Sequence, residues 1–301
     1  MSVRAELLST AEAGETEAVT RQLADVERRL REVAGDAPPP VGEAASHLVA
    51  AGGKRLRPRV LLYSARVGGR VHDAVVDLAV AAELVHNASL LHDDVIDEAD
   101  IRRGRPAARA LWGNAHSVLA GDHLMAGSFE LLDKAAVPGV LAAMIATLKR
   151  LVAAEVVQLA HRGKLLPDLD HYYRVVRGKT AALFAWCAQA GARSGGADDA
   201  VCDALTEYGE QVGVAFQLCD DLLDISGSTA ELGKSLLTDL EQGVATLPVI
   251  LAAQRRPDLA ERLIERGRDA ACSDDGDLAD LVPEVRRWVE ETGADVETRR
   301  L

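Results

Sequence analysis

Aromatic residues are scarce in this chain, since Phe, Trp and Tyr together make up 3% of its 301 residues. β-Sandwiches and β-barrels are rich in aromatic and β-branched residues, so this scarcity argues against both folds. Alanine, leucine, valine, glutamate and arginine dominate, and this balance favours packed helices. The sequence therefore predicts an all-α protein. Its length and its 48% hydrophobic content fit one domain over residues 1–301.

The sequence also lacks a basic net charge, closely spaced cysteines and long apolar runs. The net charge of −13 argues against sequence-independent binding to nucleic acid, which needs a basic surface. The four cysteines show no C-x-x-C spacing, so we expect reduced thiols and a cytoplasmic location. No apolar run approaches the roughly 20 residues of a membrane-spanning helix, and the N-terminus does not resemble a secretory signal. We therefore expect a link to lipids only through a substrate or product.

Apolar residues recur three or four positions apart along most of the chain, a spacing typical of amphipathic helices. Gly, Pro and Asp clusters separate the helical segments. The predicted helices cover residues 1–34, 42–51, 71–97, 115–134, 137–161, 168–191, 198–225 and 245–256, and another begins at Pro58. The last residues end inside an amphipathic pattern without a cap, so we expect a short or truncated C-terminus.

Two acidic motifs lie within this helical pattern. The segments LLHDDVIDEADIRRG and FQLCDDLLDISG each contain the pattern D-D-x-x-D, formed by Asp93, Asp94, Asp97 and by Asp220, Asp221, Asp224. The first and last aspartates of each motif are one helical turn apart on the same face. Three aspartates near a helix end repel one another, and this costs stability unless a cation compensates.

A solvated polar face would explain one such motif without any ligand. Two motifs, both flanked by apolar residues that can form the wall of a cleft, favour a binding site instead. Carboxylate oxygens without paired Cys or His suit Mg²⁺, which binds through a few carboxylates, water and substrate phosphates. The motifs therefore predict magnesium ions that hold a diphosphate and make it a good leaving group.

A basic group accompanies the acidic motifs. Lys54, Arg55 and Arg57 in GGKRLRP, and Arg102 and Arg103 in IRRG, lie beside glycines that let the backbone approach a ligand. Surface salt bridges would also explain these residues. Beside two carboxylate motifs, however, we expect this group to bind a second diphosphate directly.

Four segments in this order, GGKRLRP, LLHDDVIDEADIRRG, GKTAALF and FQLCDDLLD, resemble the polyprenyl synthetase family of trans-isoprenyl diphosphate synthases. The resemblance covers most of residues 40–250. It implies an isoprenoid-synthase helical bundle around a deep central cavity, with the two aspartate motifs facing each other across its mouth. It also implies a homodimeric, Mg²⁺-dependent prenyltransferase that condenses isopentenyl diphosphate with an allylic diphosphate.

The resemblance implies a role for each matching residue. The main magnesium ligands would be Asp93, Asp97 and Asp220, supported by Asp94, Asp221 and Asp224. The allylic diphosphate would be held by Arg102, Lys179 and Lys234, and the isopentenyl diphosphate by Lys54, Arg57, His86 and Arg103. Thr180 and Gln217 would lie beside the reacting carbons. Without the resemblance, we would interpret His86 as a satisfied core histidine.

Product length is expected to depend on residues along the helix that carries Asp93. Ala88 and Ser89 stand where short-chain synthases of the family often have a bulky aromatic residue, so the resemblance implies a medium or long product. Phe129, on another predicted helix, can still form a floor for the product. A farnesyl or geranylgeranyl diphosphate synthase is therefore an alternative.

The sequence departs from the family pattern in two places. Val244 in GVATLP replaces a lysine that usually contacts the allylic diphosphate, and the short C-terminus lacks helices that often follow.

Two rival functions fit the sequence less well. A class I terpene cyclase would typically mix Asn, Ser and Glu in its second motif, whereas this chain has three aspartates there. A non-catalytic subunit of a heteromeric prenyl synthase would usually lose aspartates, but both motifs are intact here.

Overall fold

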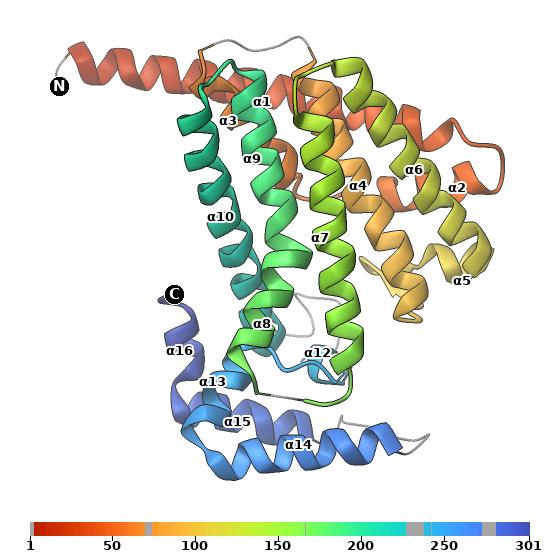
Figure 1. The fold of residues 1–301 in the computed structure, drawn as a ribbon, viewed down its shortest axis with the longest axis vertical. Coiled ribbons are helices and arrows are strands. Elements are labelled where there is room, and N and C mark those ends of the chain that lie inside the picture. The colour runs from red at the N-terminus through yellow and green to blue at the C-terminus, as the bar shows by residue number, and fades with distance from the viewer. Residues whose placement is uncertain (1–2, 70–73, 166, 227–237, 242, 273–280) are drawn as a thin grey trace. The chain divides into compact units, whose positions relative to one another are not determined.

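The computed structural model describes all residues except 1–2, 70–73, 166, 227–237, 242 and 273–280 (Figure 1). The described residues form helices and loops and one hairpin of two-residue strands, which confirms the predicted all-α class. They divide into two compact units, Met1–Ile145 with Leu183–Gly209 and Ala146–Ala182 with Glu210–Leu301. The single domain and the deep central cavity stay predictions.

The first unit contains the N-terminal helices. Its complete elements are α1 (Val3–Gly35), α2 (Val41–Ala50), α3 (Leu56–Val67), α4 (Val75–Ile96), β1 (Ile101–Arg102), β2 (Arg105–Pro106), α5 (Ala108–Trp112) and α6 (Asn114–Ala135). Three more helices have residues in both units, namely α7 (Val140–His161), α9 (Ala182–Ser194) and α10 (Asp199–Ser226).

The helices of the first unit pack closely because many of their buried side chains are small. α4 is buried throughout residues 78–85 and packs against α6, α3 and α1 (Figure 1). Burial on all sides is typical of a core helix whose sequence is apolar all round. On α9, Gly191 lies so close to α3 that a Cβ atom there would be 2.3 Å from the backbone oxygen of Leu61. A larger residue at this position would force the two helices apart.

The second unit is built around α13. Its complete elements are α8 (Leu169–Val176), the π-helix η1 (Arg177–Ala181), α12 (Thr238–Glu241), α13 (Leu247–Arg255), α14 (Pro257–Cys272), α15 (Val282–Thr292) and α16 (Ala294–Thr298). α13 packs against α14, α15, α16 and α8. Its Leu247, Val249 and Ile250 are buried in one apolar cluster with Trp288 of α15.

Most predicted helices agree with the structure to within a few residues, but three features differ. The predicted helix at 168–191 is divided into α8, η1 and α9. The residues around Arg102, for which no helix was predicted, form a β-hairpin. Its two turn residues, Arg103 and Gly104, have φ angles of 52° and 71°, as in the tightest hairpin turns. Helices α5, α12 and α14 to α16 were not predicted. No helix in the described part of the chain is long and apolar enough to cross a membrane.

Candidate functional site

The first aspartate motif lies where α4 ends. Asp93 and Asp97 are partly exposed. The backbone N–H of Asp97 donates to the backbone oxygen of Asp93 at 2.7 Å, so the two residues are one helical turn apart. Asp94 is fully buried. Its Oδ1 accepts a hydrogen bond from Nε of Arg102 at 2.7 Å and forms an ion pair with Nη2 of the same guanidinium at 2.6 Å. The motif thus has two accessible carboxylates, while the third holds an arginine of the neighbouring hairpin.

The second motif, near the end of α10, has a similar division. Asp220 is exposed, whereas Asp221 is 1% exposed. The Asp221 carboxylate accepts hydrogen bonds from Tyr172 Oη at 2.6 Å, Gln217 Nε2 at 3.0 Å and the backbone N–H of Leu247 at 3.2 Å. Burial raises the pKa of Asp221, although all three donors act to lower it. Asp221 therefore joins α10 to α8 and α13, and Asp220 is accessible to a ligand.

Tyr172→Phe tests this anchoring of the second motif. The change removes the 2.6 Å hydrogen bond and leaves Asp221 Oδ2 with the weaker contact to Leu247. Hydrogen bonds to charged groups contribute about 1.5–3 kcal/mol, so we expect the free energy of unfolding to fall by about that amount in a denaturant titration. Tyr173→Phe is the matched control on the same helix, and an equal loss in both variants would contradict the role of Tyr172.

Lys179, Thr180 and Gln217 lie together in the second unit. Lys179 and Thr180 belong to η1, which packs so closely on α7 that a Cβ at Gly178 would be 2.5 Å from the Ala154 Cβ. π-Helical turns of this kind are frequent at functional sites. Thr180 Oγ1 donates to Gln217 Oε1 at 3.0 Å. Because Gln217 also donates to Asp221, a chain of hydrogen bonds joins Thr180 to the second motif.

Lys179 pairs with a carboxylate that the sequence analysis did not single out. Its Nζ lies 2.6 Å from Glu155 Oε2 of α7, and both side chains are partly exposed. The structure thus places this predicted diphosphate-binding cation beside an acidic partner, as it does for Arg102 and Asp94. Lys234, the third cation predicted for the allylic diphosphate, lies outside the described residues.

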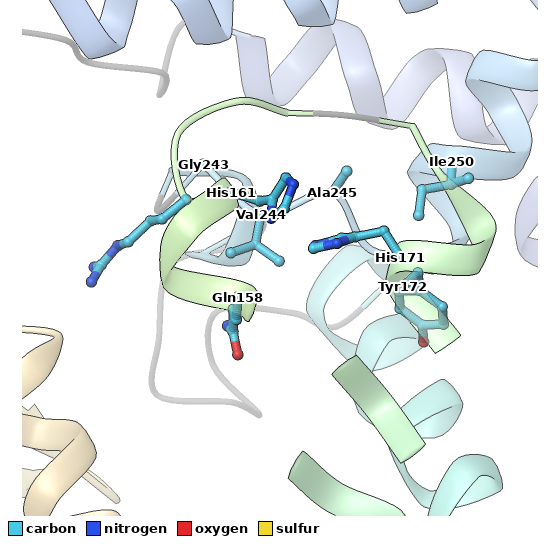
Figure 2. A pocket seen from close by; sticks show the side chains of 9 residues that line it. Gln158, His161, His171, Tyr172, Gly243, Val244, Ala245 and Ile250 are labelled. Atoms are coloured by element: carbon cyan, nitrogen blue, oxygen red, sulfur yellow. The ribbon is translucent and has the colours of Figure 1, made fainter. Parts of the chain in front are cut away.

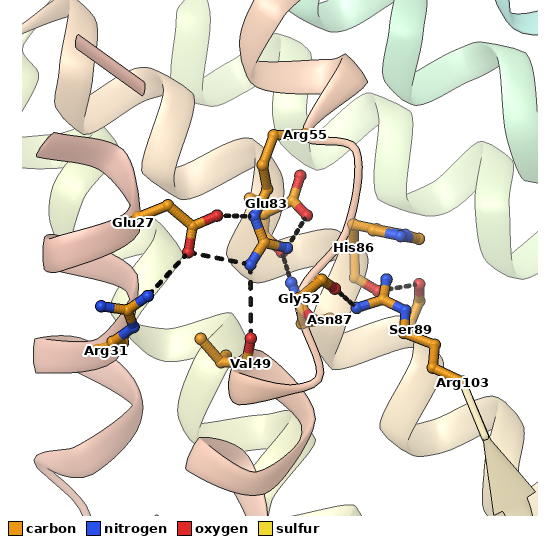
Figure 3. A network of polar contacts seen from close by, with 10 residues as sticks. All are labelled: Glu27, Arg31, Val49, Gly52, Arg55, Glu83, His86, Asn87, Ser89 and Arg103. Atoms are coloured by element: carbon orange, nitrogen blue, oxygen red, sulfur yellow. Dashed lines mark hydrogen bonds and ion pairs between the residues drawn. The ribbon is translucent and has the colours of Figure 1, made fainter. Parts of the chain in front are cut away.

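The residues predicted for isopentenyl diphosphate come together in the first unit. Lys54 is exposed in the loop before α3, and the Arg57 guanidinium lies 4.7 Å from the ring centroid of Phe184. Arg103 donates a hydrogen bond to the backbone oxygen of Gly52 in the same loop (Figure 3). Burial and four nearby arginines, with Arg57 and Arg103 the strongest, lower the pKa of His86 well below its ordinary value. His86 therefore lies in a strongly cationic environment suited to an anion.

One prediction from the basic group is wrong. Arg55 was expected to bind the second diphosphate together with the rest of the basic group, but the residue is only 6% exposed. It forms ion pairs with Glu83 of α4 and Glu27 of α1 (Figure 3). Because these carboxylates neutralise its charge inside the protein, Arg55 is not available to a ligand.

His86 should make the stability of the protein depend on pH. Its lowered pKa means that the unfolded chain takes up a proton near the ordinary value of about 6.5 while the folded chain does not. The stability that comes from neutral His86 is therefore present above about pH 6.5 and is lost as the pH falls towards the folded pKa. We expect a smaller drop in Tm on acidification for His86→Gln than for the unmodified chain. Equal drops would contradict this assignment.

The product-length residues differ in their surroundings. Ala88 is fully buried, whereas Ser89 and Phe129 are partly exposed. Ser89 Oγ donates to the backbone oxygen of His86 at 2.8 Å. Ser89 precedes Asp93 by one turn on the same face of α4, so it is the better placed of the two α4 residues to meet a product that begins at the motif.

Val244, the departure from the family pattern, lines a small pocket in the second unit (Figure 2). His161, His171 and Tyr172 line the same pocket, and the ring centroids of the two histidines are 4.3 Å apart. Burial and the charge of His161 lower the pKa of His171. The position of the usual lysine is therefore apolar here, with two imidazoles beside it.

The donor set fits a divalent metal ion bound with a diphosphate. Across the described part of the chain, no three His, Cys, Asp or Glu side chains gather closely enough to form a metal cage by themselves. Mg²⁺ commonly uses only one or two carboxylates and completes its shell with water and phosphate oxygens. Each motif offers accessible carboxylates of this kind, Asp93 and Asp97 in the first unit and Asp220 in the second. That the two motifs face each other stays a prediction.

Several residues of these sites were missed by the sequence analysis. Glu83 shares a helix face with His86, because they are three residues apart, so helical periodicity could have indicated it. Tyr172, Glu155 and Glu27 contact the predicted residues only through the folded structure, and no local pattern in the sequence indicates them.

Comparison with known proteins identifies the family. The family model described as polyprenyl synthetase matches residues 38–283. The chain is 41% identical to the heptaprenyl diphosphate synthase component 2 of Geobacillus stearothermophilus, over 76% of this chain and 72% of that protein. It is 40% identical to the geranylgeranyl diphosphate synthase of Methanosarcina mazei, over 71% and 67%.

One of the similar solved structures contains bound ligands. The polyprenyl synthase of Caulobacter crescentus, crystallised with calcium and isoprenyl diphosphate, superposes with a TM-score of 0.83 and 37% identity, covering 94% of this chain and 85% of that chain. In this family a divalent metal accompanies diphosphate binding, as that structure illustrates. The matched motifs, the all-α fold and the identities agree, and this chain belongs to the polyprenyl synthetase family of prenyltransferases.

Proposed function

We propose that the chain is a Mg²⁺-dependent trans-polyprenyl diphosphate synthase that adds isopentenyl diphosphate, head to tail, to an allylic diphosphate. The main support for this proposal is that the aspartates of the two motifs are arranged in the same way. Each has accessible aspartates at the surface and a buried aspartate, Asp94 or Asp221, that is hydrogen-bonded to neighbouring elements. Such anchoring keeps the accessible carboxylates in place for a charged ligand. We take residues 1–301 as one functional domain.

The proposed mechanism separates the two substrates. Bound Mg²⁺, held by Asp93, Asp97 and Asp220 with Asp224 in support, would neutralise the allylic diphosphate and favour its departure. Arg102, Lys179 and Lys234 would bind the same diphosphate, and Lys54, Arg57, His86 and Arg103 would bind isopentenyl diphosphate.

The reaction then requires little covalent chemistry from the protein. The allylic carbon–oxygen bond breaks, and the isopentenyl double bond attacks the allylic carbon and forms the new carbon–carbon bond. This attack leaves a carbocation on the other carbon of the former isopentenyl double bond. The methylene carbon between this cation and the diphosphate-bearing carbon loses a proton, which the released diphosphate can accept, and a new double bond forms. Thr180 and Gln217, held together by their hydrogen bond, would lie beside the reacting carbons and help to exclude water.

A medium or long product is supported by the small residues of α4 and by the similarity to a heptaprenyl diphosphate synthase component. Similarity to a geranylgeranyl diphosphate synthase and the position of Phe129 on α6 favour the shorter alternative. Product sizing distinguishes the two, as discussed below.

We also propose a cytoplasmic homodimer. On the second-unit part of α7, Val152, Val156 and Leu159 are 64%, 60% and 40% exposed and follow one face of the helix. Contiguous exposed apolar patches commonly mark contacts with another protein. The similarity to a synthase component raises a heteromeric partner as the alternative. A molecular mass near 64 kDa by light scattering, about twice the 32.0 kDa of the chain, is expected for the homodimer.

The reaction itself is tested with radiolabelled isopentenyl diphosphate. The metal-stripped protein is incubated with farnesyl diphosphate and increasing Mg²⁺, and label in the prenyl fraction is counted. We expect incorporation that requires both the metal and the allylic substrate. Absence of incorporation with dimethylallyl, geranyl, farnesyl and geranylgeranyl diphosphate would contradict the proposal for this chain acting alone.

A further inference from the structure

Arg55 has an unusual backbone conformation for its place in the chain. It immediately precedes α3, with a φ angle of 50° and a ψ angle of 41°, in the left-handed region. This conformation is unfavourable for a residue other than glycine. Lys54 precedes it directly and Arg57 follows one residue later, so the conformation of Arg55 helps to set the direction of both cations.

The Arg55 side chain is held by two other helices and by α2 (Figure 3). Its Nη1 lies 2.8 Å from Glu83 Oε1 of α4, and its Nη2 lies 3.2 Å from Glu27 Oε2 of α1. Nε also donates to Glu27, and Nη2 donates to the backbone oxygen of Val49 at 3.4 Å. One planar guanidinium thus joins α1, α2 and α4 to the start of α3.

The same loop is held from its other side by the hairpin. Arg103 donates to the oxygen of Gly52, and Gly53 lies against both guanidiniums. A Cβ atom at Gly53 would be 3.2 Å from Arg55 Nη1 and 3.5 Å from Arg103 Nη2. The backbone at Gly52 and Gly53 therefore lies beside two arginines, Arg55 and Arg103, and Arg103 is itself predicted to bind substrate.

Stability alone does not account for this ion-pair network. Glu83 is 3% exposed, and burial of such a pair removes both charges from water. Replacement of a buried ion pair by apolar residues of similar volume is often neutral or stabilising. An apolar pair would fill the space equally well, but it would not hold Arg55 in a left-handed conformation by directional hydrogen bonds.

We propose that Glu83 and Glu27 are positioning residues for the isopentenyl diphosphate site, because through Arg55 they hold the loop that presents Lys54 and Arg57. This inference rests on the proposed function, since it assigns the loop to that substrate. Glu83 also precedes His86 by one turn on α4. Its ion pair with Arg55 therefore fixes the position of the loop relative to His86. The network acts on the loop and on no reacting atom.

The decisive variant is Arg55→Met combined with Glu83→Leu, which replaces the buried pair by apolar residues of similar volume. We expect its Tm to stay within a few degrees of the unmodified chain. We also expect its Kd for isopentenyl diphosphate, measured by calorimetry with Mg²⁺ and without allylic substrate, to rise about tenfold, which corresponds to about 1.4 kcal/mol. KM for isopentenyl diphosphate should rise similarly, while KM for farnesyl diphosphate changes less than about twofold.

Single variants separate positioning from folding. Glu27→Gln keeps the partly exposed side chain and leaves the Glu83 pair intact, so a smaller rise in the same Kd is expected. Glu130→Gln on an exposed face of α6 is the matched control and should leave the Kd unchanged.

The outcomes distinguish this inference from the proposed function. If the unmodified chain binds isopentenyl diphosphate and the folded double variant binds it equally well, the positioning role is wrong and the proposed function stands. If KM rises equally for both substrates, the network stabilises the protein in general and the inference fails. If the unmodified chain binds no isopentenyl diphosphate, both proposals fail.

Discussion

Asp220→Asn is expected to reduce kcat for prenyl transfer by about 10²- to 10³-fold, the range found when one charge-stabilising group is removed from an active site. Asp220 is the exposed carboxylate of the second motif, whereas Asp221 beside it is buried and already accepts three hydrogen bonds. The amide keeps the size of the side chain but removes a negative charge where Mg²⁺ would bind. The Mg²⁺ concentration for half-maximal rate should therefore also increase.

Asp203→Asn is the matched control for this variant, because Asp203 is an exposed aspartate of the same helix, far along the chain from the motif. It should leave kcat and the Mg²⁺ dependence unchanged. KM for isopentenyl diphosphate should change little in Asp220→Asn, since other residues are assigned to that substrate. A kcat near that of the unmodified chain would contradict the metal-binding role of Asp220.

Ser89→Phe is expected to stop chain elongation at farnesyl or geranylgeranyl diphosphate. Ser89 is one turn, about 5.4 Å along the helix, from Asp93 on the same face, so an aromatic ring there would obstruct a chain that grows along α4. Ser89 is partly exposed and has room to change, whereas Ala88 is fully buried. Chromatography of the dephosphorylated products measures the shift.

Ser89→Ala controls for the loss of the hydrogen bond to the His86 oxygen, and it should leave product length unchanged. Ala88→Phe should instead destabilise the protein by about 1–3 kcal/mol, because it adds a ring to a filled core position. Unaltered products from Ser89→Phe would exclude α4 as the limit to elongation and would favour Phe129 on α6.

Helical periodicity and the aspartate pattern predicted most of the helices and the two acidic motifs. The helix that ends at the first motif was expected at 71–97 and is α4, Val75–Ile96. A long apolar stretch with helical periodicity is the strongest signal for a helix in a sequence. The sequence also predicted that Asp220 and Asp221 lie on different faces of a helix, and the structure adds that Asp220 is exposed and Asp221 is buried. These features depend on residues close together in the sequence.

Contacts between distant segments could not be predicted in this way. Arg55 was grouped with ligand-binding cations because the sequence shows its charge but not the carboxylates of α1 and α4 that surround it. Tyr172 precedes Asp221 by 49 residues, and only the packing of α8 on α10 brings them together. Local helix propensity likewise does not reveal the close packing of Gly178 of η1 against α7.

The most direct test is mass spectrometry of the products that the purified chain makes by itself from farnesyl diphosphate, isopentenyl diphosphate and Mg²⁺. The proposed function predicts a series of prenyl diphosphates that extends beyond geranylgeranyl diphosphate, and none when Mg²⁺ is chelated. Failure to extend farnesyl diphosphate or any other allylic starter would contradict it and would indicate that this chain requires a second subunit.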